Sequence, residues 1–186
     1  MAQRAFIPSM DHRFAYINDI PKHKRPDILH FSHRKQYYQL QKIKPTGLSS
    51  WKTENLTSTL AVKIGRTPDL RWKVGFGPGS YLSKSGRSHH HYGHARHPHW
   101  ATIKAAMKAL DTVQKICASN PHIVKIVIVT ESAMLVNILA WGKNARHELA
   151  AAGFPPDMVA AYHEIKHLIN SIECHGHRFV SFWYKP

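Results

Sequence analysis

Hydrophobic and polar residues alternate over residues 59–64 and again over residues 70–76, with a turn between them at 66–69. A period of two predicts two strands joined by that turn. We expect a third strand over residues 81–92. Residues 123–129 are dense in β-branched side chains, which is typical of a central strand buried on both faces. Residues 178–184 are expected to form a last strand.

Apolar residues recur at helical spacing over residues 98–117, and Pro98 suits the first turn of a helix. Two further helices are expected over 133–141 and 158–174. The predicted order is β-β-β-α-β-α-α-β. This order predicts an α/β domain over residues 57–186, with a mixed five-stranded sheet flanked by helices.

Residues 1–56 differ from this pattern and are expected to form a basic, partly ordered N-terminal arm. A basic run at 21–26 lies between two prolines, which interrupt regular structure. Residues 33–42 mix basic and aromatic side chains and are expected to form one short helix. The arm could follow a phosphate backbone, with Tyr37 and Tyr38 stacking on bases. The alternative is a solvated tail whose aromatic side chains pack on the domain.

The charge of the chain points to a polyanionic partner. Lysine and arginine number 26 against 11 aspartates and glutamates, a net charge of +15, and there are sixteen histidines. Nucleic acid is therefore the first partner to consider, and an anionic membrane surface the second. No apolar run approaches a membrane span and no secretory signal is visible, so we expect no membrane partner. An intracellular protein, nuclear or cytoplasmic, is expected, and the N-terminus leaves a mitochondrial presequence open.

The two cysteines, Cys117 and Cys174, are not in a metal-ligand spacing, which excludes a cysteine-rich zinc site. A disulfide between them is conceivable. The simpler interpretation is two reduced, partly buried thiols.

Four segments in order resemble the type 1 ribonuclease H domain, especially its divergent fungal versions. They read RWKVGFGP (71–78), ATIKAAMKAL (101–110), IVIVTES (126–132) and VSFWYKP (180–186). The similarity covers residues 57–186. It implies a ribonuclease-H-like fold and a surface for nucleic acid, such as an RNA–DNA hybrid. Enzymes of that family hold two divalent metals between carboxylates at one edge of the sheet.

The departures from this family concern its acids. The resemblance implies that Lys63 lies near the place of the first aspartate and that Thr102 replaces the glutamate of the first helix. Glu131 alone keeps a carboxylate, and the helix with the fourth acid would follow the end of this sequence. One carboxylate cannot hold two Mg²⁺ ions. We therefore expect a nucleic-acid-binding domain that has lost two-metal catalysis and needs no cofactor.

Two alternatives come with this resemblance. One is an active ribonuclease H that holds Mg²⁺ or Mn²⁺ with displaced acids, Glu54 and Asp69. The other is a protein-interaction module that reuses the fold, which a broad apolar patch would favour. The residues expected to bind nucleic acid are basic and come from both regions: Lys63, Arg66, Arg71, Lys73, Lys104, Lys22, Lys24, Arg25, Arg34 and Lys35.

Histidines supply a further alternative. Residues 163–167 read HEIKH, which matches the H-E-x-x-H pattern of zinc peptidases, with His163 and His167 as ligands. Lys166 and the lack of a third ligand at a diagnostic spacing favour an exposed basic helix face instead. Six histidines fall within residues 89–99, and we expect a solvated tract that binds metal only adventitiously.

Overall fold

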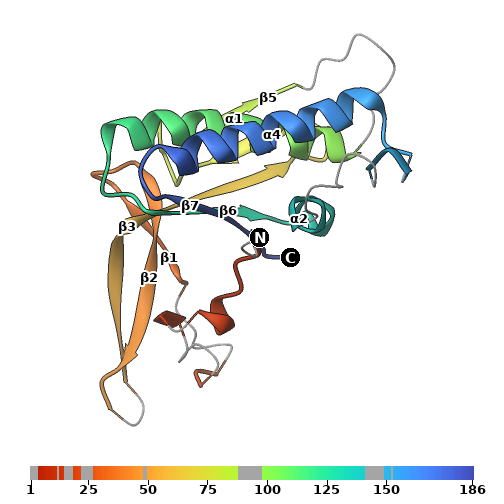
Figure 1. The fold of residues 1–186 in the computed structure, drawn as a ribbon. Helices are drawn as coiled ribbons and strands as arrows, with labels where there is room; N and C mark the ends of the chain where they lie inside the picture. The colour runs from red at the N-terminus through yellow and green to blue at the C-terminus, as the bar shows by residue number, and fades with distance from the viewer. Residues whose placement is uncertain are drawn as a thin grey trace.

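A computed structural model describes residues 4–11, 13–14, 19–21, 27–47, 50–87, 98–140, 149–151 and 153–186. Within these ranges one mixed sheet of seven strands is covered on one face by two long helices (Figure 1). The strands are β1 (Leu29–Ser32), β2 (Tyr37–Pro45), β3 (Trp51–Arg66), β4 (Trp72–Gly75), β5 (Lys84–Gly86), β6 (Lys125–Thr130) and β7 (Phe179–Tyr184). The helices are α1 (Pro98–Ser119), α2 (Ala133–Ala140) and α4 (Pro156–Cys174), preceded by a 3-10 turn at Pro8–Met10.

The long strand β3 organises the sheet. It pairs antiparallel with β2 and β4 and parallel with β6, which in turn runs parallel to β7. The body of the sheet thus has the order β5-β4-β3-β6-β7, and β1 pairs with β2. The first part of β3 forms a hairpin with β2 that extends away from the helices (Figure 1).

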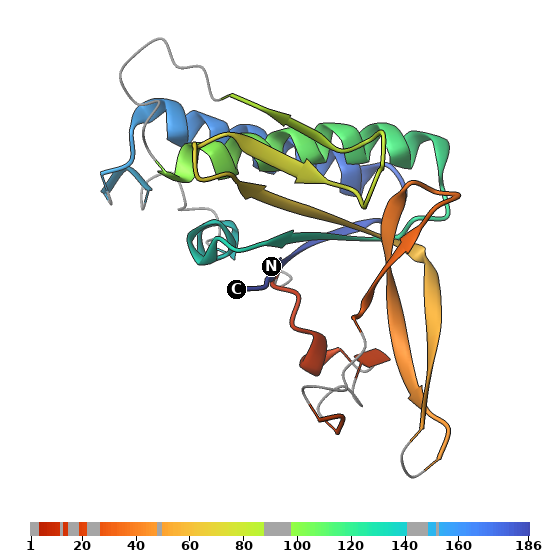
Figure 2. The same cartoon turned by 180° about the vertical axis from the view of Figure 1, so that it is seen from behind.

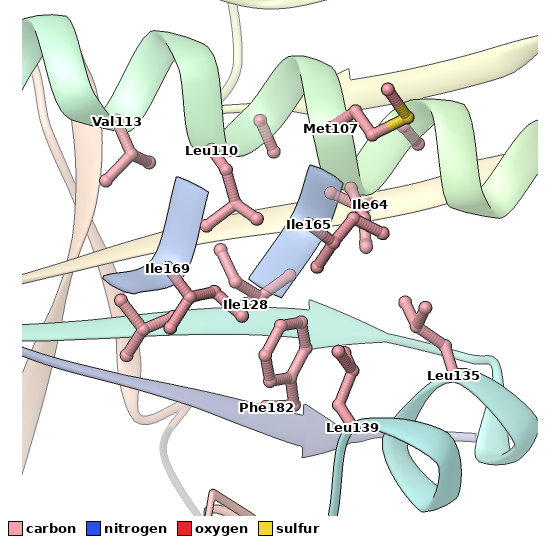
Figure 3. Packing of buried hydrophobic residues seen from close by; sticks show 14 of the residues in the cluster. Ile64, Met107, Leu110, Val113, Ile128, Leu135, Leu139, Ile165, Ile169 and Phe182 are labelled. Atoms are coloured by element: carbon pink, nitrogen blue, oxygen red, sulfur yellow. The ribbon is translucent and has the colours of Figure 1, made fainter. Parts of the chain in front are cut away.

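The helix-covered face forms the larger core because α1, α4 and the strands each present an apolar stripe. Leu110 of α1 and Ile165 and Ile169 of α4 point toward Ile128 and Phe182 of the sheet (Figure 3). All five side chains are buried. Close packing of this kind makes each of them costly to truncate.

The opposite face of the sheet is covered by the N-terminal segment (Figure 2). Phe6, Phe14 and Ile20 are buried there in one cluster with Ala61 and Val127. The segment also extends the sheet, because the Phe6 amide donates to the Phe182 carbonyl over 2.7 Å and the Phe182 amide donates to the Arg4 carbonyl over 2.7 Å. Residues 4–20 are therefore part of the folded body where the structure describes them.

Two sets of ion pairs fix this segment. Asp11 binds Arg13 at 2.6 Å and Lys125 at 2.9 Å, and its side chain is only 13% exposed. The hydrogen bond from Arg13, with a further one from Lys125, holds the pKa of Asp11 well below its usual range against the opposing effect of burial. Arg4 forms a bidentate pair with Glu173 of α4, at 2.6 and 3.0 Å.

The structure confirms the three predicted helices and the strands around residues 59–64, 70–76, 123–129 and 178–184. The short helix expected over residues 33–42 is wrong. This segment is a turn followed by β2, because Tyr37 and Leu40 are buried on the sheet. The sheet has seven strands in the described ranges, not five, since β1 and β2 join it. The boundary expected at residue 56 falls inside β3.

The third predicted strand is shorter than expected. Residues 81–92 were expected to be extended, whereas β5 covers Lys84–Gly86 and residues 88–97 lie outside the described ranges. Both cysteines are free thiols, with Cys117 buried and Cys174 exposed. Burial raises the pKa of the Cys117 thiol. No helix in the described part of the chain is both long and apolar enough to cross a membrane.

Candidate functional site

A cleft of about 590 Å³ lies over β3, β4 and β5, and cationic side chains outnumber carboxylates among its described lining residues. Four cations line it: Lys63 and Arg66 from β3, Lys73 from β4 and Lys84 from β5. Among the described residues of its lining, Glu131 is the one carboxylate. A hollow with this balance attracts anions, because cations around a concave surface reinforce one another's field.

Alternation along β3 decides where Lys63 points. Leu60, Val62 and Ile64 face the helices and are buried, so Lys63 points to the opposite face. Its Nζ lies 4.8 Å from the centre of the Tyr38 ring, which positions the ammonium by a cation–π contact at the cleft wall.

Lys63 and its neighbour Ile64 therefore face opposite sides of the sheet. On the face toward the helices Ile64 is 4% exposed, and Arg66, the last residue of β3, follows it on the same face. Thr102 of α1 is also buried and lines one hollow together with Arg66. Lys63 lies one residue before Ile64 along β3 and on the other face of the sheet. Its charge belongs to the large cleft and does not face the α1 side of this edge.

Glu131 follows β6 directly and is exposed. Besides the large cleft it lines two smaller hollows, one of about 200 Å³ with Lys185 and one of about 340 Å³ with Arg66 and Thr102. The turn that carries it is fixed, because the Ser132 amide donates to Thr130 Oγ1 and the Leu135 amide donates to Ser132 Oγ. The sequence therefore places this carboxylate correctly at the end of the central strand.

The two displaced acids lie elsewhere. Glu54 pairs with Lys44 at 2.6 Å and Lys42 at 3.3 Å on the β2–β3 hairpin, and these contacts lower its pKa. Asp69 accepts from Thr67 and pairs with Arg71 at 2.6 Å, which lowers its pKa. Neither acid lines a hollow that Glu131 lines. Within the described ranges no three His, Cys, Asp or Glu side chains lie close enough to hold a metal ion.

The rim of the large cleft is tied to β1. Gly77 has φ of +150°, a conformation that favours glycine. The ring of Phe31 occupies the space that a side chain at position 77 would need. The loop after β4 thus packs directly on the strand next to the β2–β3 hairpin.

The remaining predicted cations are distributed differently. Arg71 is held by Asp69, and Lys104 Nζ lies 5.3 Å from the centre of the Trp100 ring on α1. Neither lines the large cleft. Arg34 and Lys35 line a separate cleft of about 450 Å³. Lys22, Lys24 and Arg25 lie outside the described residues.

Two residues of the large cleft, Tyr38 and Lys84, were missed by sequence reasoning as cleft residues. Tyr38 was expected on the arm, where it would stack on bases, and it instead forms the wall beside Lys63. Lys84 lies in the predicted third strand, and a charge on a short edge strand was the signal that could have selected it.

The histidine motif lies on the solvent side of α4. His163, Glu164 and His167 are exposed, whereas the buried stripe of the helix runs through Tyr162, Ile165 and other residues. This arrangement fits an exposed helix face. Among the histidines of the 89–99 tract the structure describes His99, which lines the 340 Å³ hollow; the other five lie outside the described ranges.

Comparisons with known proteins do not assign a family. No family model matches the chain, and a search of curated proteins finds no match.

Proposed function

We propose that this protein binds nucleic acid through the large basic cleft. The observation that carries the proposal is the placement of Lys63, Arg66, Lys73 and Lys84 around one hollow, with Glu131 as the one carboxylate among the described lining residues. A phosphate backbone is the polyanion that such a cleft suits, since each bound phosphate releases condensed counterions. The net charge of +15 adds long-range attraction to the same partner.

The strand arrangement supports the ribonuclease-H-like scaffold that the sequence motifs suggest. The consecutive strands β3 to β5 pair antiparallel, and β6 and β7 run parallel to β3 on its other side. Helix α1 connects the two groups and lies on one face. In that family the catalytic acids converge where the equivalents of β3 and β6 end, which here is the edge at Ile64 and Glu131.

We further propose that this site does not catalyse two-metal cleavage. Two ions bridged about 3.5–4 Å apart need several carboxylates to displace part of their hydration shells. At this edge Glu131 is accompanied by Ile64 and Thr102, and the cations of the large cleft lie close by. Glu54 and Asp69 are paired elsewhere, so the active-ribonuclease alternative finds no support in their positions.

Fluorescence anisotropy across a salt series tests binding. Labelled single-stranded RNA, single-stranded DNA and an RNA–DNA hybrid serve as probes. Affinity should fall with a log–log slope of about −0.7 to −0.9 per phosphate contacted. The variant Lys63→Glu/Lys73→Glu should bind at least about tenfold more weakly. Its salt dependence should fall by the slope expected for about two phosphate contacts.

The matched control is Lys52→Glu/Lys108→Glu, which changes the charge equally at two exposed positions outside the clefts described above. It should lose much less affinity, and thermal melting should show that both variants fold. Undetectable binding by the wild type at low salt would contradict the proposal. Equal losses in the two variants would show that net charge alone, and not the cleft, drives binding.

The labelled hybrid also tests catalysis. Incubated with Mg²⁺ or Mn²⁺, it should stay intact in the presence of the wild-type protein. Glu131→Gln serves as the control, because a contaminating nuclease would cleave the hybrid equally in the wild-type and variant preparations. Cleavage by the wild type that disappears in Glu131→Gln would establish an active metal site and overturn the proposed loss of catalysis.

A further inference from the structure

A second cleft, of about 450 Å³, is lined by the β1–β2 turn, the loop before β5, and the C-terminal half of α1. The charged residues that the structure describes in its lining are all cations: Arg34, Lys35, Lys84 and Lys115. Lys115 is paired with Asp111, but Arg34, Lys35 and Lys84 have no carboxylate partner among the described residues. Lys35 Nζ lies 3.0 Å from His122 Nε2, which adds another basic side chain beside it. This cleft therefore also attracts anions.

The two clefts meet at Lys84, which lines both. In the β4–β5 ladder Lys84 is opposite Val74, which faces the helices, while Ser85 is opposite Lys73. Since side chains alternate between faces, Lys84 lies on the helix side of the edge strand and Lys73 on the other side. The large cleft is lined from both faces of β4 and β5, so a ligand that contacts Lys73 and also fills the second cleft bends around the β5 edge at Lys84.

An exposed aromatic ring lies in the second cleft. Tyr81 is 77% exposed, the largest exposed fraction among the large apolar side chains of the described residues. Two hydrogen bonds hold the loop that carries Tyr81. Ser80 Oγ donates to the Gln36 carbonyl at 2.5 Å and accepts from the Leu82 amide at 3.2 Å. An exposed aromatic ring beside cations is the arrangement on which nucleic-acid bases stack.

We infer that the two clefts form one continuous track for single-stranded nucleic acid, with phosphates at the cations of both clefts and a base on Tyr81. The inference rests on the proposed function and adds the class of ligand. A duplex is too stiff to turn around a strand edge, since its persistence length is about 150 base pairs. A single strand bends freely and exposes the π faces of its bases.

Oligonucleotides of increasing length test the track. Labelled oligo(dT) and oligo(U) of about 4, 8, 12 and 16 nucleotides span the site sizes of single-strand-binding grooves. Affinity should rise steeply once the oligonucleotide is long enough to reach the second cleft. Tyr81→Ala should weaken binding of the long oligonucleotides about tenfold and leave the shortest unchanged. Tyr184→Ala, which removes an exposed tyrosine from β7, is the matched control and should change neither.

A double charge reversal distinguishes phosphate contacts from base stacking. Arg34→Glu/Lys35→Glu should reduce the affinity for long oligonucleotides and flatten their salt dependence, while Lys52→Glu/Lys108→Glu should do so much less. A blunt duplex of the same length should bind more weakly than the single strand. Poly-glutamate of equal charge should compete poorly, because it offers no base to Tyr81.

The outcomes distinguish this inference from the proposed function. Short oligonucleotides that bind while length, Tyr81→Ala and Arg34→Glu/Lys35→Glu have no effect would overturn the track and leave the first cleft as the site. A duplex that binds as tightly as the single strand, or poly-glutamate that competes equally, would also overturn it. Absence of binding at every length at low salt would overturn the proposed function itself.

Discussion

The two faces of the central sheet are buried by different kinds of structure. On one face α1 and α4 supply regular apolar stripes, and that cluster contains 31 buried residues within the described ranges, against 10 in the cluster on the other face. On the second face an irregular N-terminal segment supplies a few large side chains and is fixed by Asp11 and Arg4. The difference teaches that the helix face carries most of the hydrophobic stabilisation. The second face depends more on single contacts and on charge.

The largest effect is expected on the helix face. Leu110→Ala removes a fully buried side chain from between α1 and the sheet, and should lower the free energy of unfolding by about 2–5 kcal/mol. Urea unfolding followed by circular dichroism measures this. Val124→Ala, at a 44% exposed position, is the control and should change it by about 0.5 kcal/mol or less. A loss at Leu110 no larger than this would show that the helix layer is not the stabilising core.

A smaller, pH-dependent effect is expected on the second face. Asp11→Asn removes the carboxylate partner of Lys125, whose side chain is 16% exposed, and should cost about 1–2 kcal/mol at neutral pH. Because the folded state lowers the pKa of Asp11, its contribution is fully present above the unfolded pKa of about 3.9. It is lost as pH falls toward the lowered folded value.

The difference between wild type and Asp11→Asn should therefore shrink as the pH is lowered from about 5. Chemical unfolding at a series of pH values measures it. Asp111→Asn removes an exposed acid of α1 and should have little effect at any pH, since surface ion pairs contribute about 0–1 kcal/mol. If the difference in unfolding free energy stayed constant at all pH values, Asp11 would act by packing and not by charge. The second face would then be stabilised in the same way as the helix face.

The helix face could be predicted from the sequence because regular elements leave a period in it. Residues 98–117 and 158–174 repeat apolar side chains at helical spacing, and both helices are present. Residues 123–129 are apolar almost throughout because β6 is buried on both faces. For these elements local pattern and tertiary burial agree.

The second face could not be predicted in this way. Phe6, Phe14 and Ile20 have no periodic spacing, so nothing in the chain marks them as cover for a sheet. The segment 33–42 is rich in glutamine and basic residues, which are compatible with a helix. Pairing with β3 and burial of Tyr37 and Leu40 decide in favour of a strand.

The candidate site was predictable in part. Glu131 follows a recognisable central strand, so its place at the strand end could be inferred. The face of Lys63 follows from the alternation of its neighbours, but its contact with Tyr38 could not be inferred, because that contact depends on the pairing of β2 with β3. Lys84 lines both clefts because it lies opposite Val74 in the β4–β5 pair. This pairing of strands cannot be read from the sequence alone.

The bridge between Ala5 and Phe182 has a consequence for the order in which the chain is made. About 180 residues separate the two partners, and a ribosome adds about 5–20 residues per second. The N-terminal segment therefore waits about 10–35 s after its own synthesis before the strand it pairs with exists. During that interval Phe6 and Phe14 have no β7 edge to dock on, and they are exposed as the apolar sites on which a chaperone can act.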